Sequence, residues 1–408
     1  MPEPLILAFV FALGACVGSF LNVVVWRLPR QQSLVSPPSR CTSCGHRLAW
    51  YDNVPVFGWL WLGGRCRYCK ARISIRYPIV EAVTGAIFVV FYIAMFDLQW
   101  GPCRPTPRPL SISEDWPIYG LYMFLLACLL AASLIDAELF VIPLEICLLL
   151  AGVGLLVHVL VDSPTLAGNV IVSPAWAAVA AGGTIGWLLS LLLLHCNLLR
   201  RSFPDGEPLL EADREAVEAE IETARRQGQP PPALPPRYTF AQILSELFRE
   251  ILFLLPGLVL AAAAGLLVLH NPIVGEIWAR WVAHESVRAL LGALLGALVG
   301  GLVVWVTRIL GTIVFRRVAM GLGDVHLMFG VGAVIGAGPV VVAFFLAPFF
   351  GMLLAVYMLL TGKRREIPYG PYLSLGTAAS VLFYCRIADW LQPGLSGLGQ
   401  AAGAWLRG

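Results

Sequence analysis

The chain has 408 residues, of which 58% are hydrophobic and only 13% are charged, and its mean hydropathy is +0.78. Because soluble domains carry about 25% charged residues, this composition excludes an ordinary soluble protein and indicates a chain that crosses a membrane several times. The formal net charge of +3 is too small to indicate a nucleic-acid-binding protein.

Apolar segments long enough to cross a bilayer recur along the chain. The first lacks a basic n-region and continues directly into further sequence, so we interpret it as a permanent span and not as a cleaved signal. A shorter, Gly-rich run at 324–338 is either a further span or a re-entrant segment. We therefore expect an all-α polytopic membrane protein with about ten transmembrane helices. The expected spans are 4–26, 78–97, 117–135, 141–161, 174–199, 247–270, 286–314, 324–338, 340–361 and 371–392.

Basic residues concentrate in some of the segments between these spans, and the segments that should face the other way are poorer in Arg and Lys. Cytoplasmic loops carry the excess of Lys and Arg. An outside N-terminus followed by about ten spans places every basic segment in the cytoplasm. The basic segments are 27–77, 200–246, 316–317 and 363–365.

Four of the ten cysteines form two C-x-x-C pairs in the first basic segment, with a spacer of about 20 residues between the pairs. This spacing predicts a tetrahedral zinc site, and four protein ligands leave no open position, which favours a structural role. Two disulfides are the alternative, but they require an oxidising compartment. The expected ligands are Cys41, Cys44, Cys66 and Cys69. The remaining cysteines fall into two groups. Cys103 and Cys196 show no partner pattern. The others lie within expected spans and are interpreted as small apolar residues: Cys16, Cys128, Cys147 and Cys385.

Two acids interrupt strongly apolar sequence. Asp136 stands in "LIDAELF" and Asp324 in "GLGDVHLM", and the expected topology places both at the cytoplasmic ends of spans that run from outside to inside. Two neighbouring carboxylates share a proton, so the ionised one activates a water while the protonated one polarises a scissile carbonyl, without a metal. A helix cap is the alternative for each acid. Competing acids nearby are Glu81, Glu138 and Glu145.

These features divide the chain into regions. The charged, Pro-rich segment 200–246 reads as a solvated cytoplasmic insertion, with partner docking as the alternative. The expected order is a first helix at 1–26, a cytoplasmic zinc-binding domain at 27–77, helices two to five with Asp136 at 78–199, an insertion with an extra transmembrane helix at 200–285, the helices with the Gly-x-Gly-Asp motif at 286–392, and a C-terminal tail at 393–408.

Taken together, several motifs resemble those of the type IV prepilin peptidases, aspartic membrane proteases of the GxGD type. Two of them contain the acids Asp136 and Asp324, and another comprises the two cysteine pairs. The motifs are "GSFLNVVVWRLP" (18–29), the C-x-x-C pairs, "ISIRYPIVEAVTG" (73–85), "LIDAELFVIP" (134–143), "GLGDVHLM" (321–328) and "IPYGPYLSLG" (367–376).

The resemblance implies that Asp136 and Asp324 are the catalytic pair, supported by the loop of Gly321, Gly323 and His326. It implies cleavage of the short basic leaders of type IV prepilins and pseudopilins at the cytoplasmic face of a bacterial inner membrane. Many bacterial members also N-methylate the new terminus with S-adenosylmethionine, and Glu81 is our candidate for binding this donor. The expected partners are the prepilin substrates, the lipid bilayer and the pilus or secretion machinery.

The chain departs from the family pattern at several positions, among them Tyr369, which stands where the family element before the last span has Phe. His326 stands where the family usually has Lys, and Leu144 where it often has Asp. Because His titrates near neutrality, the charge near Asp324 is expected to depend on pH. Two other classes of function stay open. One is an inactive membrane scaffold of a pilus or type II secretion assembly with a structural zinc module, and the other is a transporter that uses the acids as a proton relay.

Overall fold

The computed structural model describes residues 3–103, 108–161, 166, 172–203, 218, 221–222, 238–316, 318–361 and 368–405. These residues form helices joined by short connections, and no strand occurs among them beyond two isolated bridges. The chain divides into two compact units, which are described in turn. The first unit is Met1–Val172, Ala283–Gly301 and His326–Gly408, and the second is Ser173–Val282 and Leu302–Val325.

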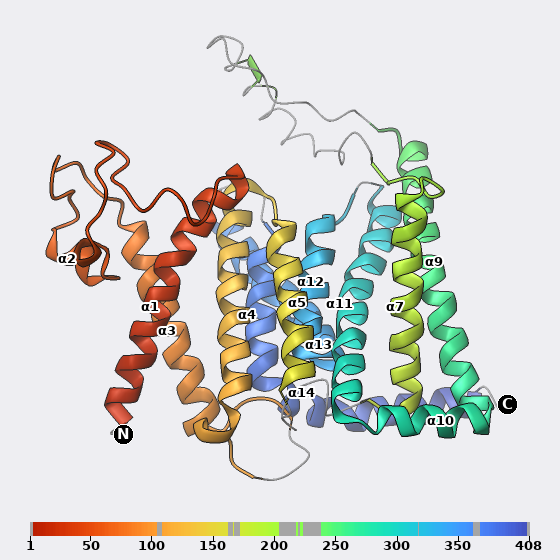
Figure 1. The fold of residues 1–408 in the computed structure, drawn as a ribbon. Coiled ribbons are helices and arrows are strands. Elements are labelled where there is room, and N and C mark those ends of the chain that lie inside the picture. The colour runs from red at the N-terminus through yellow and green to blue at the C-terminus, as the bar shows by residue number, and fades with distance from the viewer. Residues whose placement is uncertain are drawn as a thin grey trace. The chain divides into compact units, whose positions relative to one another are not determined.

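The helices of the first unit follow the expected spans closely (Figure 1). Within this unit α3 packs along α1, and α14 packs against both α4 and α13. Alanines of α5, α11 and α12 form a small buried cluster, so these helices lie close together. The helices are α1 (Glu3–Arg27), α3 (Arg76–Tyr92), α4 (Ile112–Leu139), α5 (Leu144–Leu160), the first part of α11 (Glu285–Phe315), most of α12 (Leu322–Ile335), α13 (Ala337–Thr361) and α14 (Gly370–Trp405).

The second unit consists of a pair of long helices, a short third helix and the last part of α11. In it α7 (Pro174–His195) packs along α9 (Phe240–His270), and the short α10 (Pro272–Val282) contacts both. The side chain of Ser173 caps α7, and Thr239 with Gln242 forms a capping box at the start of α9. The unit therefore begins at Ser173, ahead of the insertion expected from residue 200, and it includes the last part of α11.

Seven of the described helices are long and apolar enough to cross a membrane, namely α1, α3, α4, α7, α9, α11 and α13. The apolar helices α5 and α12 are shorter. At 1.5 Å per residue α12 is about 21 Å long, less than the hydrocarbon thickness of about 30 Å. With α14, these helices coincide with the expected spans, and the all-α polytopic fold is confirmed. The α14 helix continues to Trp405, into the segment expected as a tail.

One cysteine interpretation was wrong. Cys103 and Cys385 form a disulfide, with their Cα atoms 5.4 Å apart, although Cys385 reads as an apolar residue and Cys103 has no partner pattern in the sequence. The two residues are separated by 282 positions, so only the packing of α14 in the first unit brings them together. No local spacing rule could have detected such a pair.

Candidate zinc module and carboxylate sites

The four cysteines of the C-x-x-C pairs meet in one cluster, as the spacing predicts. Their ligand atoms all lie within 4.8 Å of one another, and the sulfurs of Cys41 and Cys69 are 3.7 Å apart. Zinc–sulfur bonds of about 2.3 Å in a tetrahedron place sulfurs about 3.8 Å apart. The donor set therefore fits a zinc ion, and it holds Cys41, Cys44, Cys66 and Cys69.

Two similar turns present these thiols. In the first, the N–H of Cys41 donates to the carbonyl of His46 at 2.9 Å, and Gly45 adopts the left-handed conformation that the turn requires, with φ +71°. The second turn repeats the pattern between Cys66 and Ala71, also at 2.9 Å. The backbone N–H groups of the first turn, at Cys44 and Ser43, lower the pKa of Cys41 to about 6. This thiol is consequently ionised at neutral pH, which is the form that binds metal.

The cysteine-bearing segment 27–77, which we call the zinc module, is attached to span α3. The backbone N–H of Val56 donates to a carboxylate oxygen of Glu81 at 2.7 Å, and the indole N–H of Trp59 donates to the carbonyl of Ile73 at 3.1 Å. Within the module, the guanidinium of Arg67 donates to both oxygens of the buried Asp52, at 2.9 and 3.1 Å. Glu81, our candidate for donor binding, thus contacts the module directly.

Asp136 lies buried in the last turn of α4. Its Oδ2 accepts a hydrogen bond of 2.9 Å from the backbone N–H of Gly370, the first residue of α14. A Cβ atom at residue 370 would lie 2.7 Å from the same oxygen, so only glycine lets the backbone approach the carboxylate this closely. This contact supplies a physical role for the "YGP" motif, which the sequence showed only as a resemblance.

Asp324 lies in the first turn of α12, where it is also buried. It is the third residue of the helix, so the position before the first turn belongs to Gly321 and not to the acid. A carboxylate in a first turn is favoured by the helix dipole. His326, two residues on, is exposed. Asp136 and Asp324 belong to different compact units, so each site is described by itself.

A buried ion pair in the second unit holds the loop that leads to Asp324. Arg308 of α11 is fully buried, and its guanidinium donates to Glu250 of α9 at 3.1 to 3.3 Å. Trp305 donates to the same carboxylate at 2.8 Å. Another N–H group of Arg308 donates to the carbonyl of Met320, next to the Gly-Leu-Gly-Asp segment. The N–H of Ala319 donates to Thr312 at 3.2 Å.

The sequence analysis missed this pair. Opposite charges stood in two expected spans, 247–270 and 286–314, and intramembrane charges almost always pair. The two opposite charges could therefore have indicated a contact between Glu250 and Arg308, but they do not indicate what the contact does. Only the structure links the pair to the backbone of Met320.

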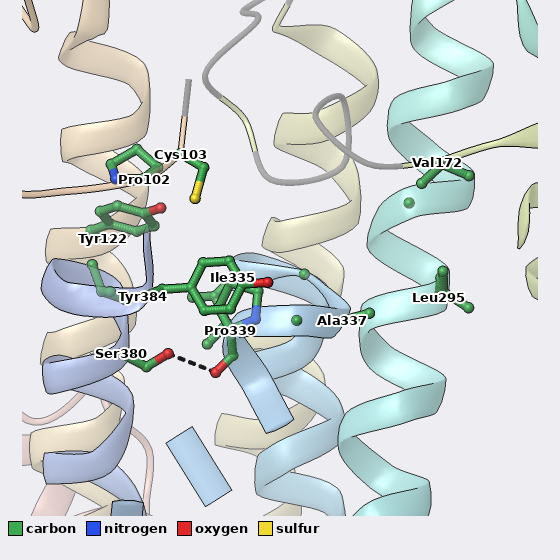
Figure 2. Close-up of a pocket in the computed structure, with 14 residues that line it drawn as sticks. Pro102, Cys103, Tyr122, Val172, Leu295, Ile335, Ala337, Pro339, Ser380 and Tyr384 are labelled. Carbon is green, nitrogen blue, oxygen red and sulfur yellow. Dashed lines mark hydrogen bonds between the residues drawn. The ribbon is translucent and has the colours of Figure 1, made fainter. Parts of the chain in front are cut away.

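A cavity of about 110 Å³ lies elsewhere in the first unit, beside the disulfide. Figure 2 shows Cys103, Tyr122 and Tyr384 around it, together with the hydrogen bond of 2.7 Å from the Ser380 hydroxyl to the carbonyl of Pro339. Tyr122 and Asp136 share α4 and are about 21 Å apart along it at 1.5 Å per residue. The cavity is therefore separate from the Asp136 site.

Comparison with known proteins identifies the chain's relatives. Residues 12–95 match a family model described as the bacterial peptidase A24 N-terminal domain. The prepilin leader peptidase/N-methyltransferase of Myxococcus xanthus (strain DK1622) is 59% identical over 85 residues, which are 21% of this chain and 25% of the relative. The protein of that name from Klebsiella pneumoniae is 34% identical over 191 residues, 45% of this chain and 75% of the relative.

The type 4 prepilin-like proteins leader peptide-processing enzyme of Escherichia coli O78:H11 (strain H10407 / ETEC) is 36% identical over 143 residues, 31% of this chain and 46% of the relative. The chain thus covers less than two thirds of the Myxococcus and Escherichia proteins. No solved structure matches the chain. The N-terminal match and the 75% coverage of the Klebsiella protein show that the chain belongs to the prepilin leader peptidase/N-methyltransferase family.

Proposed function

We propose that the protein is a membrane aspartic endopeptidase that removes the leader peptides of type IV prepilins and pseudopilins at the cytoplasmic face of a bacterial inner membrane. The observation that carries the proposal is the buried Asp136, whose carboxylate is oriented by the Gly370 N–H at the start of α14. The names of the family relatives support prepilin processing. The second acid of the proposed pair is Asp324.

The N–H donor at Gly370 is the basis for assigning the roles of general base and hydrogen-bond donor to the two acids. This hydrogen bond fixes the orientation of the Asp136 carboxylate, and we propose Asp136 as the base that takes a proton from the attacking water. Asp324, protonated, then donates a hydrogen bond to the scissile carbonyl oxygen as the water oxygen bonds to the carbonyl carbon. On collapse the C–N bond breaks, and Asp136 returns its proton to the leaving amine.

The second activity that we propose is N-methylation of the new N-terminus with S-adenosylmethionine. The names of the relatives include this activity. Glu81 stays our candidate for contacting the donor, and its carboxylate is already close to the zinc module through Val56. The test of both activities is co-expression with a prepilin, followed by mass measurement of the product's N-terminus. Loss of the leader reports cleavage, and the mass of one added methylene reports methylation.

The role proposed for zinc is to stabilise the fold of the zinc module. We expect the Cys41→Ser variant to lose most of its bound zinc and to give a lower yield of folded protein, because structural zinc contributes about 10–16 kcal/mol to folding in small zinc domains. Zinc per protein is measured by elemental analysis of the purified chain. Cys196→Ser, an exposed cysteine outside the cluster, is the matched control. Equal zinc content in the Cys41→Ser and control proteins would refute the site.

The chemistry of the cysteines supports the proposed orientation. The free thiols of the zinc module precede α3 and the disulfide cysteine Cys103 follows it, so the two kinds of cysteine lie at opposite ends of one span. Thiols persist in the cytoplasm and disulfides in oxidising compartments. In spheroplasts we expect a membrane-impermeant maleimide to label Cys103 and Cys385 only after reduction. It should label Cys44 and Cys69 only after permeabilisation and removal of zinc with a chelator. The opposite pattern would invert the topology.

A further inference from the structure

One face of the zinc module exposes large apolar side chains. In the short helix α2 (Phe57–Trp61), Phe57, Leu60 and Trp61 occupy positions i, i+3 and i+4, which share one face of a helix. Their exposed fractions are 66%, 58% and 86%, and Trp50 nearby is 82% exposed. Trp59 turns the other way, toward the carbonyl of Ile73. We call Phe57, Leu60 and Trp61 the aromatic face.

The aromatic face lies close to the beginning of span α3. Val56, the residue before α2, donates to Glu81, which lies five residues after the first residue of α3, Arg76. Five residues correspond to about 8 Å along a helix axis. Figure 1 shows α2 beside the first turns of α3, which belongs to the same unit. Interfacial helices bury their apolar faces about 5–10 Å into the boundary between headgroups and acyl chains, which agrees with this position.

The charge of the module identifies the partner. Its single acid, Asp52, is already paired with Arg67. Anionic lipids attract basic segments near the membrane surface, and Trp is enriched at the interface between lipid and water. A basic leader peptide would instead be repelled by a surface of the same sign. The basic residues are Arg27, Arg30, Arg40, Arg47, Arg65, Arg67, Lys70, Arg72 and Arg76.

We propose that the aromatic face inserts into the headgroup layer of the leaflet on the module's side of the membrane, and that the surrounding arginines bind its anionic lipids. The zinc module then lies against the bilayer and is not a free cytoplasmic domain. Insertion removes the apolar surface of Phe57, Leu60 and Trp61 from water, which favours the attached position of the module. The inference does not depend on the proposed proteolysis, since it concerns only the attachment of the module.

The test is photo-crosslinking of the full-length protein in nanodiscs that contain phosphatidylglycerol and phosphatidylcholine. A benzophenone amino acid replaces Trp61, and in a matched control it replaces Val35, a module residue that is 90% exposed and lies outside the aromatic face. We expect at least about fivefold more lipid adduct at residue 61 than at residue 35. Equal adducts at the two positions would overturn the proposal.

Two further arms separate the possible partners. In membranes from cells that produce a prepilin, the probe at residue 61 should still crosslink to lipid, and a dominant protein adduct would assign the aromatic face to a protein partner instead. In nanodiscs of phosphatidylcholine alone, the lipid adduct at residue 61 should fall severalfold, because the arginines have lost their anionic ligands. An unchanged adduct would refute the role of the basic residues.

Discussion

Replacing Asp136 or Asp324 by Asn is expected to lower leader cleavage by about a hundredfold to ten-thousandfold, the range that general acid–base groups contribute. Asn has nearly the same shape as Asp, and at position 136 its side-chain carbonyl still accepts the N–H of Gly370, so folding should be retained. The amide at position 136 cannot take the proton of the attacking water, and at position 324 an amide N–H is a weaker donor to the scissile carbonyl than a carboxylic acid O–H. Cleavage of a co-expressed prepilin, with folding checked by size-exclusion profile, measures the effect.

The matched control is Glu138→Gln. Glu138 follows Asp136 by two residues, but it is exposed and forms an ion pair with Arg76, so its loss should leave cleavage close to that of the wild type. If the Asp136→Asn or Asp324→Asn protein cleaves as well as the control, that acid is removed from the mechanism. If both do, the two acids have a structural role only, and the inactive scaffold becomes the better account of the protein.

The second large effect is expected at the buried ion pair. Arg308→Met leaves the Glu250 carboxylate buried without its guanidinium partner, and breaking a buried pair in this way costs about 3–5 kcal/mol. Glu250→Gln together with Arg308→Met removes both charges, while the Gln oxygen still accepts from Trp305. We therefore expect the double variant to recover most of the lost stability, measured as the midpoint of thermal unfolding in one detergent.

Activity separates the two roles of Arg308. The double variant lacks the guanidinium that donates to the carbonyl of Met320, so we expect its cleavage rate to stay below that of the wild type even when its stability is restored. Arg280→Met is the control, because both side chains of its pair with Glu276 on α10 are exposed. A double variant no more stable than Arg308→Met would contradict the charge argument. Wild-type cleavage by the double variant would show that the contact with Met320 does not position Asp324.

Features that depend on neighbouring residues could be predicted from the amino-acid sequence. Apolar runs of about 20 residues predict spans, because that length of helix crosses the hydrocarbon core. In the bilayer the backbone N–H and C=O groups find hydrogen-bond partners only within the helix. The C-x-x-C pairs determined the cysteine cluster because each pair forms one short turn and the two turns repeat the same hydrogen bonds. The resemblance to prepilin peptidases followed from local motifs and agrees with the family found by comparison.

The tertiary structure alone decided the contacts between distant residues. Cys103 pairs with Cys385, Gly370 donates to Asp136, and Arg308 joins Glu250 to Met320, each across helices that the chain order does not show to be neighbours. Such contacts depend on which helices pack together. In lipid, helix association is driven by close packing and a few polar bonds, because the lipid tails are as apolar as the helices. The hydrophobic pattern of the sequence therefore does not indicate which helices are neighbours. The proximity of Asp136 and Asp324 stays a prediction of the sequence.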